Sequence, residues 1–245
     1  MTKRKKYILI FTAIPIVLVM AFIIWAGSSS QPMDEAVQVM EGTEQVIVDT
    51  EKWMTFTPEK GTAIKKGFIF YPGAKVEPEA YAPLAKEIAK QGVKVIIVPM
   101  PLNLAVFGSN EALQVIAHHK EIKEWVIGGH SLGGSMAARL VYKHSKQFDG
   151  LILWASYPAE NNDLSDSSLP ILSIYGELDG LATPEKIDQS QKLLPINTQW
   201  VKIEGGNHSQ FGWYGFQQGD KEAEISRERQ QEIIIRETVD FIRGI

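Results

Sequence analysis

The segment EWVIGGHSLGGSMAARLVYKH, residues 124–144, decides the fold. It opens with a short apolar run, Trp125–Gly128, that is typical of a buried strand, and it closes with a helix-forming stretch, Leu132–His144. Between them lies GHSLG at 129–133, a G-x-S-x-G pattern whose serine sits on a sharp strand-to-helix turn. Glycine is needed beside such a turn because larger side chains would collide with neighbouring elements. The pattern predicts that Ser131 projects over one end of a sheet.

Ser131 needs two partners if its hydroxyl is to act as a nucleophile, a base that takes its proton and an acid that orients the base. On this kind of turn the three groups follow one another in the order Ser, Asp or Glu, His. Asp179 follows the apolar strand 171–175, and His208 follows a strand that ends at 203. Both therefore lie at the carboxyl ends of strands, where ligands meet such sheets. The sequence predicts Ser131, Asp179 and His208 as a catalytic triad.

Other carboxylates and histidines compete for these roles. Glu177 lies in the same loop as Asp179, but it is interpreted as a solvated loop carboxylate. His130, inside the turn, is expected to pack or to hydrogen-bond locally rather than to act as the base. Three further histidines lie near the ends of predicted helices, where a cation favours the helix dipole: His118, His119 and His144.

The sequence also predicts an oxyanion hole made of backbone N–H groups. The N–H of Leu132 lies at a helix N-terminus, where the amide and the dipole stabilise a developing oxyanion. A second donor is expected from the loop after the third strand, YPGA at 71–74. Ala74 is the preferred donor and Gly73 the alternative, unless the loop is an ordinary Pro-Gly turn.

From residue 44 onward, short β-branched runs alternate with segments of helical period. This pattern predicts an α/β domain, a mostly parallel sheet of about eight strands with helices on both faces. Two early strands, 45–49 and 53–57, are expected to open the sheet in antiparallel fashion. About 16 residues separate the strands that end at Trp154 and begin at Ile171, which leaves no room for a large lid domain.

The N-terminus predicts a membrane anchor. Residues 7–26 form a run of 20 residues without a charge, about the length that crosses a hydrocarbon core of roughly 30 Å. A basic cluster at 3–6 precedes it and is expected to stay cytoplasmic, so that residue 28 onward lies outside. Signal-peptide cores are shorter, about 7–15 residues, although small residues at 26 and 28 leave secretion after cleavage as an alternative. A buried soluble helix is the third interpretation.

The predicted organisation is therefore a basic cytoplasmic end at 1–6, a transmembrane anchor at 7–26, a linker at 27–43 and an α/β domain at 44–245. Four of the 25 basic residues precede position 28, whereas all 29 acidic ones follow it, so the exported part carries about −8. This charge argues against nucleic-acid partners and against adhesion to anionic lipid. The chain has no cysteine, which excludes disulfides, and it carries no metal-ligand cluster, P-loop or dinucleotide fingerprint, so no cofactor is expected.

With these residues in place, the chain resembles the α/β-hydrolase superfamily, and more closely a bacterial branch of dienelactone-hydrolase-like proteins described as α/β-hydrolase fold-5 domain proteins. The similarity covers nearly all of residues 60–235. Its marks are FYPGAKVEPEAYAPLA at 70–85, VPMPLNLAVFG at 98–108, GGHSLGG at 128–134, LWASYPA at 153–159, YGELDG at 175–180 and GGNHSQFGWYGFQQGD at 205–220. The resemblance implies the same triad, but no substrate. Dienelactone hydrolases use a cysteine nucleophile, which this chain lacks, so their lactone activity is not carried over.

Aromatic residues in loops at the same sheet edge are candidates for a substrate pocket, and Phe107, Tyr157 and Phe211 are the ones selected. The function expected is a serine hydrolase that cleaves a small-molecule carboxylic ester through an acyl-enzyme on Ser131. An acyltransferase or a peptidase would share this chemistry. A non-catalytic binding module on the same fold is the remaining alternative, which an intact triad argues against.

Overall fold

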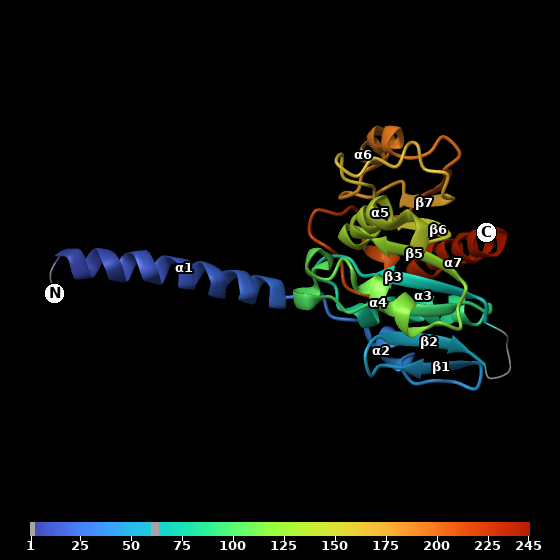
Figure 1. Cartoon of the computed structure of the whole chain (residues 1–245), viewed down its shortest axis with the longest axis horizontal. Helices are drawn as coiled ribbons and strands as arrows, with labels where there is room; N and C mark the ends of the chain where they lie inside the picture. Colours follow the sequence, from blue (N-terminus) through green and yellow to red (C-terminus); the bar gives the residue numbers. More distant parts are fainter. Residues whose placement is uncertain (1–2, 60–63) are drawn as a thin grey trace.

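A computed structural model of the chain describes residues 3–59 and 64–245, with the backbone alone for 3–11 and 26. Eight strands form one sheet in the order β1-β2-β4-β3-β5-β6-β7-β8 (Figure 1). β2 pairs with β1 and β4 in antiparallel fashion, and the strands from β4 to β8 are parallel. The bounds are β1 Val46–Asp49, β2 Met54–Pro58, β3 Lys66–Tyr71, β4 Lys94–Ile97, β5 Glu124–His130, β6 Gly150–Trp154, β7 Ile171–Gly176 and β8 Gln199–Ile203.

Helices cover both faces of the sheet, as the alternating pattern predicted. Their bounds are α1 Lys3–Gly27, α2 Asp34–Gln38, α3 Ala82–Ala89, α4 Glu111–His118, α5 Leu132–His144, α6 Pro184–Ser190 and α7 Arg227–Gly244. Successive side chains of a strand point to opposite faces. In β3, accordingly, Phe68 and Phe70 pack in a core with α3 and α7, whereas Ile69 and Tyr71 pack in a second core with α4 and α5. Two hydrophobic layers thus hold the sheet, and its carboxyl edge is left for loops.

The connection between β6 and β7, residues 155–170, contains no helix or strand. It crosses the sheet edge as turns and bends, as its short length predicted. No lid domain is therefore inserted at this point of the fold.

The N-terminal region differs in part from the prediction. The expected helix is present as α1, which extends away from the rest of the chain (Figure 1). Over the residues that the structure describes, however, no helix is long and apolar enough to cross a membrane.

Part of the segment 27–43, which was predicted as a linker, packs on the domain in the structure. Ala36 of α2 is fully buried, and Ser30 and Pro32 form isolated β-bridges with Val76 and Tyr214. Apolar and backbone contacts therefore attach residues 30–36 to the folded unit.

Candidate active site

Ser131 lies on the turn between β5 and α5, with φ +52° and ψ −122°. A non-glycine residue with a positive φ of this kind is strained by about 1–3 kcal/mol, so the surroundings must hold it. They do so through the backbone. The Ser131 N–H donates to the Trp154 carbonyl at 3.0 Å, and the Ser156 hydroxyl donates to the Ser131 carbonyl at 2.6 Å. β6 and its following loop thus fix the serine on this strained turn.

The glycines around Ser131 are required by close packing. A Cβ on Gly133 would lie 2.1 Å from the Tyr71 carbonyl oxygen, and one on Gly129 would lie 2.6 Å from the same atom. The end of β3 therefore rests directly against the turn. This contact brings the loop that follows β3 beside the N-terminus of α5, where the oxyanion hole was predicted.

Asp179 and His208 form a buried acid–base pair. His208 Nδ1 and Asp179 Oδ2 are 2.8 Å apart, and the two side chains are 1% and 0% exposed. The other carboxylate oxygen, Oδ1, accepts hydrogen bonds from the N–H groups of Leu181 at 2.8 Å and Ala182 at 2.7 Å. A carboxylate with these donors is held in one orientation, and it in turn fixes the ring of His208.

His208 also lies next to the serine turn. Its ring centroid is 4.4 Å from that of His130, the residue before Ser131. The free ring nitrogen, His208 Nε2, is buried and has no hydrogen-bond partner among the described residues. This is the atom that would take a proton from Ser131, and such contacts often tighten only when substrate binds.

Glu177, the competing acid, points elsewhere. It is exposed, its carboxylate accepts a hydrogen bond from the Gly205 N–H at 3.0 Å, and Lys202 lies 3.6 Å away. The Gly205 hydrogen bond and then the Lys202 charge lower the pKa of Glu177. The structure therefore pairs His208 with Asp179 and leaves Glu177 at the surface, as the sequence analysis preferred.

His130 belongs to a buried link that the sequence did not reveal. Its Nδ1 is 2.8 Å from the Tyr81 hydroxyl, which also accepts the Gly73 N–H at 3.1 Å. The Tyr81 hydroxyl therefore joins two groups, since its oxygen accepts the Gly73 N–H while it shares a hydrogen bond with His130 Nδ1. Burial and the nearby His208 hold the pKa of His130 well below its usual range. A neutral histidine thus connects the serine turn to the loop after β3.

The Tyr81 contact distinguishes between Gly73 and Ala74, the two candidate oxyanion donors in that loop. The Gly73 N–H is already used by Tyr81, and a side chain at Gly73 would collide with Tyr81 and His130. The N–H groups of Ala74 and Leu132 have no partner in the part of the chain that the structure describes. The geometry therefore favours Ala74 over Gly73, with Leu132 at the start of α5 as the other free donor.

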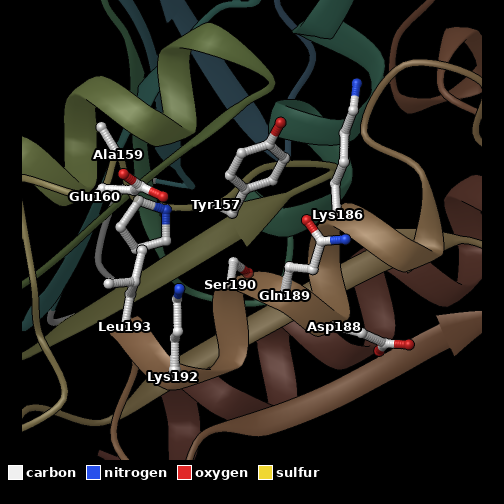
Figure 2. A pocket seen from close by; sticks show the side chains of 10 residues that line it. Tyr157, Ala159, Glu160, Lys186, Asp188, Gln189, Ser190, Lys192 and Leu193 are labelled. Carbon is white, nitrogen blue, oxygen red and sulfur yellow. The ribbon is translucent and has the colours of Figure 1, made fainter.

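Ser131 opens onto a pocket of about 300 Å³ that is walled by residues of α5 and of the loops after β6 and β7. Tyr157 lines this pocket and also a larger one of about 720 Å³. Figure 2 shows the larger pocket, which Tyr157 lines together with residues of α6 and of the turn after it, among them Gln189 and Lys192. Tyr157 is the one predicted pocket aromatic that lines the space beside the serine.

The other two predicted pocket residues lie elsewhere. Phe211 is fully buried and its ring stacks on His130, with centroids 5.5 Å apart, so it supports the turn from behind. Phe107 is 54% exposed and meets the edge of Phe22 in α1. Sequence reasoning placed both at the correct sheet edge, but it could not tell which way each ring points.

The remaining histidines are distant from this chemistry, as expected. His118 and His119 pack against Trp53, and His144 ends α5. Within the described residues, no group of three or more histidine, aspartate or glutamate side chains is placed to hold a metal ion.

Comparison with known proteins supports the fold. Similar solved structures include Est1E from Butyrivibrio proteoclasticus with ferulic acid bound (13% identity, TM-score 0.61, covering 80% of this chain and 98% of that one). An esterase domain from Rhodothermus marinus is 12% identical, with a TM-score of 0.60 and coverage of 78% and 92%. The esterase Est2 from Thermogutta terrifontis is 15% identical, with a TM-score of 0.54 and coverage of 82% and 93%.

A comparison with curated protein sequences gives no match. The family model of the alpha/beta hydrolase family, in contrast, matches residues 67–232, which is more than half of the chain and includes Ser131, Asp179 and His208. The strand order, the turn at Ser131 and this match agree, and the chain belongs to the alpha/beta hydrolase family.

Proposed function

We propose that the protein is a serine hydrolase that cleaves carboxylic esters through an acyl-enzyme on Ser131. The observation that carries the proposal is the buried Asp179–His208 pair, whose imidazole lies against the residue preceding the strained serine. A binding module would have no use for a carboxylate and an imidazole held in this order beside a partly exposed serine.

The reaction begins when the Ser131 hydroxyl attacks the ester carbonyl carbon and His208 Nε2 takes its proton. Asp179 stabilises the imidazolium that forms and keeps the ring in the tautomer with its proton on Nδ1. The carbonyl oxygen becomes an oxyanion, and the free N–H groups of Ala74 and Leu132 are the donors that would receive it.

The tetrahedral intermediate collapses when the C–O bond to the alcohol breaks and His208 returns the proton to the leaving oxygen. Water then attacks the acyl-enzyme, again with His208 as the base, and releases the acid and the free serine. An acyltransferase would use the same residues, with a second alcohol or an amine attacking the acyl-enzyme in place of water. A peptidase would also use them, with an amine in place of the alcohol as the leaving group.

The space around Ser131 favours a small or medium ester. The pocket beside the serine, about 300 Å³, is at the lower end of ligand-site volumes. No helix or strand covers the site between β6 and β7, so a substrate can enter without interfacial activation. The similar structures whose titles name esterases agree with an ester-type substrate.

The test is labelling of the full-length protein with a fluorophosphonate, followed by hydrolysis of p-nitrophenyl esters of graded acyl length and of matching anilides. We expect rapid labelling that needs no detergent or lipid, no labelling of Ser131→Ala, and unchanged labelling of Ser145→Ala, an exposed serine just after α5. Folded wild-type protein that fails to label would exclude the serine mechanism. Preference for the anilides would instead favour the peptidase.

A location outside the cytoplasm is a separate proposal that rests on the sequence of residues 3–26, a basic cluster followed by 20 uncharged residues. If the segment anchors the protein, the domain should resist extraction by salt and should be cut by protease added to the outside of intact cells. Full-length protein found free in the cytoplasm would contradict it.

A further inference from the structure

Asp220 joins the loop that carries the acid to the loop that carries the base. Its Oδ1 accepts hydrogen bonds from the N–H of Gly180 at 3.0 Å and the N–H of His208 at 3.2 Å. Its Oδ2 accepts two more from Ser209, the N–H at 2.7 Å and the hydroxyl at 2.6 Å. One carboxylate thus bonds the residue after Asp179, the base itself and the residue after the base.

The backbone around Asp220 is built for this contact. A Cβ on Gly180 would lie 2.4 Å from the Gly219 carbonyl oxygen and 2.8 Å from the Cα of Asp220, so only glycine allows the two loops to touch. Gly219 has a φ of +94°, a conformation that glycine adopts without strain. Two glycines therefore place the Asp220 carboxylate between the acid loop and the base loop.

We infer that Asp220 is a positioning residue that holds the acid and the base in register and adds a second negative charge beside His208. The inference rests on the proposed function, because it concerns the same reaction. Asp179 orients the ring of His208, whereas Asp220 fixes its main chain, and the two carboxylates act on the same residue from different atoms.

The His208 ring needs a contact that fixes its position because its reacting nitrogen is not held by a hydrogen bond. His208 Nε2 has no hydrogen-bond partner among the described residues, so no hydrogen bond at that atom determines where the ring lies. The position of the ring is set from the opposite side, by the Nδ1 contact and by the backbone. A displacement of about 1 Å at a reacting group can cost about 10²-fold in rate, which makes the backbone contact relevant to catalysis.

The experiment compares Asp220→Asn with Glu177→Gln in the full chain. Glu177 is a matched control because its carboxylate also joins the acid loop to the base loop, through the Gly205 N–H, but contacts neither catalytic residue. With p-nitrophenyl acetate we expect Asp220→Asn to lower kcat about 10–100-fold with KM within about 2-fold. Glu177→Gln should change neither.

Ser209→Ala keeps the inference testable if Asp220→Asn does not fold. It removes one of the four hydrogen bonds to the carboxylate and should lower kcat in the same direction by a smaller factor. A wild-type kcat in folded Asp220→Asn, or equal effects of Asp220→Asn and Glu177→Gln, would overturn the inference. Failure of the wild-type protein to label with a fluorophosphonate would instead overturn the proposed function itself.

Discussion

The two halves of the candidate site are built in opposite ways. On the acid–base side, Asp179 and His208 are almost completely buried, and both oxygens of Asp179 are hydrogen-bonded. On the serine side, Ser131 is partly exposed at a pocket, and the N–H groups of Ala74 and Leu132 have no partner among the described residues. One half is complete before substrate arrives, whereas the other leaves its polar groups free.

This difference follows from what each half must bind. In the proposed reaction the acid and the base act on each other throughout, so their contacts can be formed permanently and shielded from water, which strengthens them. The proposed oxyanion donors would act on a group that exists only in the transition state, so they must stay free. Substitutions on the buried acid–base side should therefore affect rate or folding.

The largest effect is expected at the acid. Asp179→Asn keeps the shape of the side chain but removes the charge that stabilises the imidazolium and fixes its tautomer, so kcat for p-nitrophenyl acetate should fall roughly 10⁴-fold. The carboxylate is fully buried and lies 2.8 Å from His208, so no nearby water can replace it. Steady-state kinetics on folded protein measure the change.

Glu177→Gln is the control for this substitution, because Glu177 lies two residues earlier in the same loop and is exposed. It should leave kcat within about 2-fold, since its contacts are to Gly205 and Lys202 rather than to the base. If Glu177→Gln proved the more damaging change, the acid would be misassigned.

The sequence predicted the strands and loops that carry the site more fully than the side-chain contacts within it. The strands predicted at 45–49, 53–57, 125–128 and 171–175 lie within one or two residues of β1, β2, β5 and β7, because buried strands are apolar runs that end at turn residues. The pairing of Asp179 with His208 followed from chain order, since both loops leave the same sheet edge. Local sequence was sufficient wherever a backbone pattern determines the position of a residue.

The parts that were missed depend on side-chain direction across the fold. Tyr81 lies 49 residues before His130, and no local pattern indicates that its hydroxyl reaches the serine turn. Asp220 ends the segment GGNHSQFGWYGFQQGD, but the four groups that its carboxylate contacts come from loops that meet only in the folded chain. Phe211 was predicted to line a pocket, but its ring stacks on His130, because sequence does not determine the direction of a side chain in a loop.

A smaller effect is expected from removing the buried Tyr81 hydroxyl, which connects Gly73 to His130. Tyr81→Phe leaves the Gly73 N–H and His130 Nδ1 without their partner in a dry interior, which should lower the free energy of unfolding by about 1–3 kcal/mol. The matched control is Tyr157→Phe, whose hydroxyl is partly exposed and has no partner among the described residues. Urea unfolding should separate the two, and equal stabilities would show that the link contributes nothing.

The smallest effect concerns the charge state of His130. Burial first, and His208 second, hold its pKa well below the usual 6.5, so the folded protein keeps it neutral where the unfolded chain would protonate it. Unfolding then takes up a proton below about pH 6.5, and stability should fall as the pH is lowered, by at most about 1.4 kcal/mol per pH unit from this group. Burial also lowers the pKa of His119, which acts in the same direction but is present in both proteins compared. His130→Gln should therefore show a shallower loss of stability between pH 7.5 and 5.5 than the wild type, and parallel curves would mean that His130 is charged in the folded state.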